Sequence, residues 1–304
     1  MPVLWRWRHA YATAATGLAR FGLRLCRRVL RVYGSPSARP IRKQTFAVWW
    51  RRSVTLVNKH AVAQAFGRAA PTYQQHAGLQ SRSGEHLMAL LTLPLHQRLL
   101  DAGCGTGWFS RRWRQQGHAI TALDLSPGML AQAEQLHSAD AYLMGDIEAL
   151  PLPEGAFDGV WSHLAVQWCE SLPQALKELT RVTRVGGQVA FSTLEAASLP
   201  ELTLAWQALG APAPVNRFLS QQAIQQACAQ YKVRLVTDRL TEHFISPLAA
   251  LQSLKGIGAT HLHSGQSRPM LSKARLRALE AVWPRDAQGY RLSYQLVYGV
   301  IEVE

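Results

Sequence analysis

The stretch Leu99-Leu100-Asp101-Ala102-Gly103-Cys104-Gly105-Thr106-Gly107-Trp108 decides the fold. Residues 96–100 predict a short buried strand that ends at Asp101, and residues 108–116 predict a helix. Three glycines at alternate positions lie between the two elements. A glycine-rich turn from a strand into a helix N-terminus cradles nucleotide-like ligands, because glycine adopts positive φ and lets a ligand approach the backbone. The stretch therefore predicts a nucleotide-binding α/β domain.

Two further strands narrow the kind of ligand. The loop lacks the Gly-Lys-Ser/Thr ending of a phosphate-binding loop, and its third glycine comes one residue too early for the dinucleotide pattern G-x-G-x-x-G. Residues 118–124 predict a strand that ends at Asp124, at a spacing from Gly103 that suits a carboxylate binding a ribose hydroxyl pair. Residues 141–144 predict a third strand, after which Asp146 can meet an adenine amino group. An NAD-binding domain, or a fold that has lost its ligand, is the alternative.

The succession of Asp-x-Gly-x-Gly-x-Gly, an acid after the second strand and Gly-Asp after the third resembles the class I S-adenosylmethionine (SAM)-dependent methyltransferases. The resemblance implies a doubly wound α/β fold with a mostly parallel, seven-stranded Rossmann-like sheet and a helical cap inserted after the fifth strand. It also implies SAM as methyl donor and a cofactor-binding role for ten residues. These are Asp101, Gly103, Gly105, Gly107, Asp124, Leu125, Met129, Asp146, Ile147 and Ser162. For Met129, packing in the core is the alternative.

Positive charge is concentrated at the N-terminus. Residues 1–55 hold 12 of the 33 Lys and Arg and none of the 19 Asp and Glu, while the whole chain carries a net charge of +14. The remainder is nearly neutral, so we expect no nucleic-acid-binding surface on the catalytic body. Residues 1–53 form a basic extension with an amphipathic pattern. We expect it to be disordered or to reflect a misassigned start, with membrane contact or targeting as alternatives.

Cysteine and histidine spacing gives no sign of a metal site. The four cysteines are widely spaced and form no C-x-x-C pair, which predicts neither disulfides nor zinc and fits a reducing cytoplasm. Cys104 is expected to pack as a small residue in the loop. His261 and His263 lie two residues apart without a further ligand set, so we expect no metal. No apolar run is long enough to cross a bilayer, and we expect no stable membrane insertion.

The order of expected elements predicts a single domain over residues 54–304 with a cap at about 195–285, and the resemblance implies that this is a methyltransferase domain with a lid at 58–92. The further strands are expected at 157–161, 188–193, 232–244 and 290–303. Helices are expected at 172–182, 199–209, 220–229, 247–255 and 272–283. In the last strand, four alternating residues are expected on one face, namely Leu292, Tyr294, Leu296 and Tyr298.

Several short sequence segments resemble the malonyl-[acyl-carrier protein] O-methyltransferases of biotin biosynthesis. They are Val-Asn-Lys at 57–59, Ala-Phe-Gly-Arg-Ala-Ala at 65–70, Leu-Ala-Val-Gln-Trp-Cys at 164–169, Ser-Leu-Pro-Glu-Leu at 198–202 and Ser-Leu-Lys-Gly-Ile-Gly-Ala-Thr at 253–260. The resemblance runs from about residue 57 to the C-terminus and leaves residues 1–53 without a counterpart. It implies methyl transfer from SAM to the free carboxylate of a malonyl thioester, giving the methyl ester that primes pimeloyl formation.

The implied reaction needs no general base, because a malonyl carboxylate is already ionised near neutral pH. Tyr73 and Trp168 are the candidate catalytic residues, which position the reactants, with packing as the alternative for Tyr73. Arg217 is a candidate for the substrate carboxylate, with a surface role as the alternative. Lys255 is a candidate for steering an acidic acyl carrier protein that carries the malonyl group. A monomer is favoured.

Two other functions remain open. A quinone-type or other small-molecule methyltransferase would use the same fold and differ in the cap. A non-catalytic cofactor-binding or membrane-associated regulator would use the basic N-terminus. A nucleic-acid amino-methyltransferase is disfavoured, because the Asn/Asp-Pro-Pro-aromatic quartet expected after the fourth strand is replaced by Ser-His-Leu-Ala at 162–165.

Overall fold

The computed structural model describes residues 57–259 and 271–304. The basic extension expected at residues 1–53 and the histidine pair at 261 and 263 lie outside the described residues. Within the described ranges, none of the helices combines the length and apolar character that a bilayer crossing requires.

A single mixed sheet forms the centre of the molecule, with strand order β3-β2-β1-β4-β5-β8-β6 and a short β7 that pairs with β8. The first five strands in this order run parallel, and β8 runs antiparallel to both of its neighbours. The bounds are β1 (Arg98–Ala102), β2 (Ala119–Asp124), β3 (Ala141–Met144), β4 (Phe157–His163), β5 (Thr183–Leu194), β6 (Lys232–Phe244), β7 (Arg285–Asp286) and β8 (Gly289–Glu302). The doubly wound, mostly parallel sheet is confirmed.

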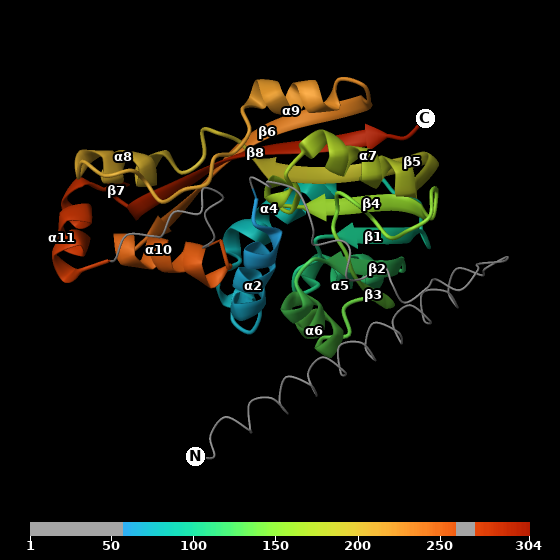
Figure 1. Cartoon of the computed structure of the whole chain (residues 1–304), viewed down its shortest axis with the longest axis horizontal. Coiled ribbons are helices and arrows are strands. Elements are labelled where there is room, and N and C mark those ends of the chain that lie inside the picture. Colours follow the sequence, from blue (N-terminus) through green and yellow to red (C-terminus); the bar gives the residue numbers. More distant parts are fainter. Residues whose placement is uncertain (1–56, 260–270) are drawn as a thin grey trace, which may run out of the picture.

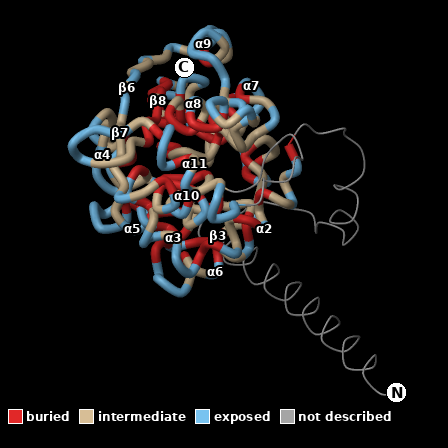
Figure 2. The backbone as a smooth tube through the Cα atoms, turned by 90° about the vertical axis from the view of Figure 1, so that its left-hand side faces the viewer, coloured by how far each residue is buried: buried red, intermediate tan, exposed pale blue. Residues whose placement is uncertain are grey.

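Helices cover both faces of this sheet (Figure 1). On one face lie α4 (Gly78–Ala89), α5 (Trp108–Gln115) and α6 (Pro127–Gln135), and on the other lie α7 (Leu172–Val182) and α9 (Gln221–Cys228). The sequence sets the helix starts: Ser126 and Ser171 accept from the backbone N–H groups of Met129 and Gln174, and a proline follows each cap within two residues. Figure 2 shows the exposed outer surface of α9 and the buried course of β8.

The antiparallel strands β6 and β8 extend past the parallel strands and carry a second group of elements at that end (Figure 1). This group comprises α8 (Pro200–Ala208), α10 (Pro247–Gly256), α11 (Lys273–Val282) and β7. Within the range expected for the cap, α9 instead packs on α7 and β6 pairs along its whole length with β8. The range 195–285 therefore contains two kinds of element: those of the sheet and its covering layer, and those at the far end.

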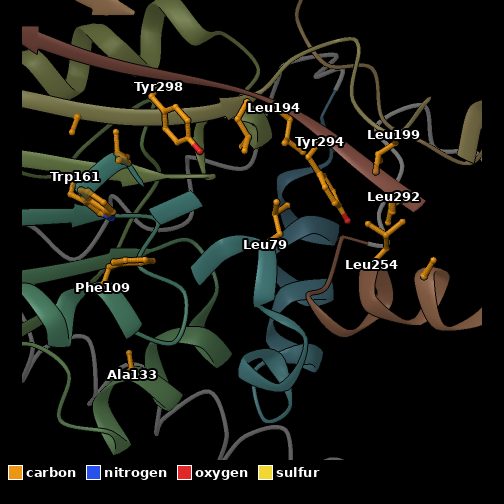
Figure 3. Packing of buried hydrophobic residues seen from close by; sticks show 14 of the residues in the cluster. Leu79, Phe109, Ala133, Trp161, Leu194, Leu199, Leu254, Leu292, Tyr294 and Tyr298 are labelled. Carbon is orange, nitrogen blue, oxygen red and sulfur yellow. The ribbon is translucent and has the colours of Figure 1, made fainter. Parts of the chain in front are cut away.

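Side chains of β8 alternate between the two hydrophobic clusters of the core. The four residues expected on one face are all buried in the same cluster, which also holds Trp161 and Phe109 (Figure 3). Val297 and Ile301 lie in the other cluster, below the opposite face. This is the period of two that an extended strand imposes on side chains.

The helices α2 (Lys59–Ala69) and α3 (Tyr73–His76) stand at the carboxyl ends of the parallel strands. Helix α2 packs on α6, where Gly67 and Gly128 approach so closely that a Cβ on Gly128 would lie 2.8 Å from the Cα of Gly67. Helix α3 packs on α10. The N-terminal helices thus bridge the parallel half of the sheet and the far-end elements.

Candidate functional site

The loop after β1 is held to the end of β2 by its backbone. The N–H groups of Gly103 and Cys104 donate to the Leu123 carbonyl at 2.7 and 2.9 Å. The N–H of Gly105 donates to Asp124 Oδ2 at 2.9 Å, and the N–H of Ser126 donates to Asp124 Oδ1 at 2.7 Å. Gly105 has a φ of +56°, and a Cβ there would meet nothing within 4 Å. The loop therefore presents bare backbone to open space beside an oriented carboxylate.

Asp101 lies beneath this loop and is 3% exposed. The hydroxyl of Ser110 in α5 donates to its Oδ2 at 2.5 Å. Burial raises the pKa of Asp101 to about 7, and burial raises the pKa of Asp124 to about 6. Two carboxyl groups at one loop thus favour a cationic partner, which would restore the charge interaction that water no longer provides.

A first cavity opens beside the loop, between it and the helices α3 and α4. Its walls include Asp101, Gly103, Gly105, Tyr73 and Gln80. The side-chain amide of Gln74 in α3 donates to the hydroxyl of Thr106 at 2.5 Å, so α3 is bonded to the loop across the cavity. A ligand on the loop would be covered by α3.

A second cavity, with about 670 Å³ of open space, adjoins the first at Tyr73 and Gln80, which line both. Its other walls come from α2, the 3₁₀ turn η1 (Val166–Trp168), α10 and β8, and most of them are apolar. Figure 3 shows Tyr294 of β8 beside Leu199 and Leu254, with Leu79 of α4 nearby, and all four line this cavity. None of its described lining residues is Lys, Arg, Asp, Glu or His.

His163, at the carboxyl end of β4, connects α4 to the sheet through hydrogen bonds. Its Nε2 lies 3.0 Å from the Gln80 carbonyl, which only accepts, so Nε2 carries the proton. Its Nδ1 then accepts from the Ser192 hydroxyl at 2.7 Å, and Ser192 in turn accepts from the Leu164 N–H. Burial lowers the pKa of His163 to about 4, so the ring is neutral at pH 7. A hydrogen-bonded neutral imidazole fixes the backbone of α4 where the two cavities meet.

Helix α2 is attached to the site at two points. The ammonium of Lys59 lies 2.6 Å from Asp146 Oδ2 and 2.5 Å from Glu148 Oε2, in the segment after β3. The ring of Phe66 meets the Trp168 ring edge-on, with centroids 5.1 Å apart. One contact lies beside the segment expected to bind adenine and the other lies in the wall of the second cavity, so α2 spans both.

Comparison with known proteins agrees with this geometry. A family profile described as "Methyltransferase domain" matches residues 100–191. The malonyl-[acyl-carrier protein] O-methyltransferase of Erwinia billingiae is 58% identical over 248 residues, which cover 82% of this chain and 99% of that protein. The protein of the same name from Salmonella typhimurium is 51% identical and covers 81% and 98%, respectively. The chain belongs to the malonyl-[acyl-carrier protein] O-methyltransferase family.

Solved methyltransferases share the fold of this family member. A putative methyltransferase from Bacillus halodurans superposes with a TM-score of 0.51 at 14% identity and covers 71% of this chain and 96% of its own. A SAM-dependent methyltransferase from Thermotoga maritima, described as a possible histamine N-methyltransferase, gives 0.50 at 16% identity and covers 80% and 100%. At these identities the similarity concerns the fold, and it confirms the Rossmann-like methyltransferase architecture.

Several residues expected to bind the cofactor lie together in this family member. Asp101, Gly103 and Gly105 line the first cavity, and Asp124 is bonded to the loop. A Cβ on Gly103 would lie 3.6 Å from the Ile147 side chain, so Ile147 is adjacent as well. Asp146 lies in the same region and is paired with Lys59. Of the two expected catalytic residues, Tyr73 lines both cavities and Trp168 lines the second.

Other expected residues lie away from both cavities. Ser162 is fully buried, and its hydroxyl donates to the Ala102 carbonyl at 2.9 Å, which joins β4 to β1. Met129 is 1% exposed and packs in α6. Gly107 is the N-cap of α5, where a Cβ would lie 2.1 Å from the Ser138 hydroxyl. Leu125 is half-buried. For Ser162, Met129 and Gly107 the structure thus gives a packing or backbone reason for the residue found there.

The two expected substrate residues, Arg217 and Lys255, are exposed and line neither cavity. Each follows a residue that lines the second cavity, Asn216 and Leu254, so both lie close to its rim along the chain. Sequence reasoning did not single out His163, Gln80 or Gln167. The only sequence signal for His163 and Gln167 was their place at and just after the carboxyl end of β4, where ligands of α/β sheets bind. Gln80 in α4 had no such signal.

Proposed function

We propose that this chain transfers the methyl group of SAM to the free carboxylate of a malonyl thioester on an acyl carrier protein. The product is the malonyl methyl ester that primes pimeloyl formation in biotin biosynthesis. The observation that carries this proposal is the second cavity, which is apolar, lacks ionised side chains among its described lining residues and adjoins the loop cavity at Tyr73 and Gln80. Its family membership supplies the substrate class.

The proposed chemistry needs alignment rather than proton transfer. SAM supplies an electrophilic methyl group on a sulfonium, and the carboxylate is already the nucleophile at neutral pH. Holding the two reacting atoms in line and excluding water lowers the barrier by several kcal/mol, on the order of what intramolecular reactions gain. Tyr73 and Trp168 form part of the cavity walls. In this proposal their π-faces stabilise the sulfonium by roughly 0.5–2 kcal/mol.

The residues around the loop suit the donor molecule. In this proposal Asp124 accepts from the ribose hydroxyls and Asp146 from the adenine amino group, with Leu125 and Ile147 beside the adenine. Asp101 faces the first cavity and pairs with the methionyl ammonium. Support comes from the buried Asp101 and the half-buried Asp124, whose carboxyl groups would gain a cationic or hydrogen-bonding partner when the donor binds.

Residues 58–92 act as the lid and the far-end helices as the cap in this proposal. The attachment of α2 through Lys59 and Phe66 supports a lid that closes over both cavities. Arg217 and Lys255 on the rim meet the phosphate of the phosphopantetheine arm or the acidic surface of the carrier protein. Exposed cations of this kind raise the association rate more than the final affinity.

We further propose that the enzyme works as a monomer in the reducing cytoplasm, without metal, nucleic acid or membrane insertion. Cys104, Cys169 and Cys228 are free thiols. Beyond residue 55 the acidic and basic residues are nearly balanced in number, which gives no general surface for polyanions.

An acceptor panel tests the proposed function. The full chain is incubated with methyl-labelled SAM and, in turn, malonyl-carrier protein, acetyl-carrier protein and malonyl-coenzyme A. Label is expected on the malonyl thioesters and absent from the acetyl thioester, which has no free carboxylate. Transfer to neither malonyl thioester, in a preparation that binds SAM, would contradict the proposal.

A further inference from the structure

Two glutamine side chains in the second cavity carry buried atoms without partners. Gln80 and Gln167 both line the cavity, and the Oε1 of each is buried and has no hydrogen-bond partner among the described residues. A buried amide without a hydrogen-bond partner is destabilised relative to the same amide in water. Such groups in a cavity wall therefore indicate a missing ligand. A rotation about χ3 exchanges the amide oxygen and nitrogen, so either end can face a ligand.

Both amides sit on backbone that is held in place. The carbonyl of Gln80 accepts a hydrogen bond from His163 Nε2 at 3.0 Å, and Gln80 lines the first cavity as well as the second. Gln167 lies between the buried Val166 and Trp168, whose ring packs on Phe66 of α2. One amide therefore belongs to the wall where the two cavities meet and the other to η1, and both line the second cavity.

The charge balance of the reaction favours neutral donors at this place. The anionic carboxylate and cationic sulfonium become a neutral ester and a neutral thioether. A cation in contact with the carboxylate would stabilise the starting state more than the transition state, in which that charge is disappearing. A neutral amide N–H orients the carboxylate and stabilises the starting state less than a cation would, so it raises the activation barrier less. This agrees with the absence of Lys and Arg from the described residues that line the cavity.

We propose that Gln80 and Gln167 donate side-chain N–H groups to the acceptor carboxylate and make the enzyme specific for a free acid, an inference that rests on the proposed function. Gln80 directs one oxygen toward the methyl group, and Gln167 holds the other. The oxygen lone pair forms the bond to the methyl carbon. The carbon–sulfur bond breaks, its electron pair stays on sulfur, and no proton moves.

Kinetics of Gln80→Met and Gln167→Met test the inference, because methionine keeps the size of glutamine and removes both polar atoms. Each variant is expected to lose about tenfold to a hundredfold in kcat/KM for malonyl-carrier protein, the effect of one hydrogen bond to a charged group. For Gln167→Met the Kd for SAM is expected to change less than twofold, because Gln167 lines only the second cavity. The control is Gln207→Met, an exposed glutamine of α8, which should match the unaltered enzyme.

Charge variants separate recognition from packing. Gln80→Glu is expected to raise KM for malonyl-carrier protein at least tenfold while inhibition by acetyl-carrier protein stays unchanged, since only the malonyl group meets the new charge. Gln167→Arg is expected to lower kcat at least tenfold without raising KM. Unaltered kinetics in both methionine variants would overturn the inference. So would a charge variant that weakens binding of malonyl-carrier protein and inhibition by acetyl-carrier protein equally. If the unaltered enzyme does not methylate malonyl-carrier protein, the proposed function fails and this inference fails with it.

Discussion

At the scale of single residues, Asp101 and Asp124 are two carboxyl groups around the loop whose pKa burial raises. Asp124 accepts from the backbone N–H groups of Gly105 and Ser126, one at each carboxylate oxygen, so the carboxylate is held in one orientation at the loop. The same side chain thus shapes the loop, and in the proposed function it also accepts from the ribose hydroxyls.

Asp124→Ala should therefore weaken SAM binding by well over tenfold, because it removes the ribose acceptor and releases the loop backbone. Isothermal titration of the full chain with SAM measures this directly. An unchanged Kd would refute the ribose role of Asp124.

Asp101 predicts a pH dependence of stability. Burial raises its pKa to about 7 in the folded chain, whereas the unfolded carboxyl titrates near its ordinary value of 3.8. Between about pH 4 and pH 7 the folded state keeps a proton that the unfolded state has lost, so this residue destabilises the unliganded fold increasingly as pH rises. Asp101→Asn should raise Tm by a few degrees at pH 8 and by much less near pH 4.

Asp158 is the matched control with the opposite sign. Its burial acts to raise the pKa, but hydrogen bonds from the Arg98 N–H and the Arg184 and Arg98 side chains lower it below its ordinary value. Asp158→Asn should lower Tm at neutral pH, and the loss should shrink as pH falls through the acid range. Thermal scans of both variants that showed the same pH trend would contradict the electrostatic interpretation.

At the scale of elements, the contact between the lid and α10 explains the phrase Leu-Lys-Gly-Ile-Gly-Ala. A Cβ on Gly256 would lie 2.1 Å from the His76 ring of α3. Gly258 has a φ of +76°, and a Cβ there would lie 2.9 Å from the Cα of Phe66 in α2. Both glycines permit close approach of the lid helices, which places Phe66 against Trp168 in the cavity wall.

Gly258→Ala should reduce kcat/KM for malonyl-carrier protein at least tenfold, because it displaces Phe66. Gly210→Ala is the control, since Gly210 has a φ of +67° and a Cβ there would meet nothing within 4 Å. Both variants carry the strain of positive φ, on the order of 1 kcal/mol, and Gly258→Ala should lose more Tm because its Cβ also clashes with the Phe66 backbone. Equal activities of the two variants would contradict a role for this contact in the site.

Sequence periodicity predicted the elements better than it predicted their contacts. The expected strands at 232–244 and 290–303 match β6 and β8. Alternation of apolar and polar residues over this length indicates a strand, because a helix would require a period of 3.6 residues. The loop and its acids were predictable because their spacing follows from local backbone geometry. The roles of His163 and Gln80 were not, since the bond between them joins positions 83 residues apart and depends on how α4 packs.

At the scale of the whole molecule, one sheet supports two cavities of different character. The parallel half carries the loop and its buried acids, and the antiparallel pair β6–β8 carries the helices around the apolar cavity (Figure 1). Helix α2 packs on α6 of the parallel half, and α3 packs on α10 beside the antiparallel pair. In the proposed function, the cationic donor and the anionic acceptor would meet at Tyr73 and Gln80, which line both cavities, with water excluded from their reacting atoms.

The most direct measurement of this account locates the transferred methyl group. The full chain is incubated with methyl-labelled SAM and malonyl-carrier protein, and the isolated carrier protein is treated with mild base. The account predicts one label per carrier protein, held as a methyl ester on the malonyl group and released by base as methanol. Label that stays on the carrier protein through base treatment, or no label at all while SAM binding is intact, would contradict the carboxylate as the acceptor.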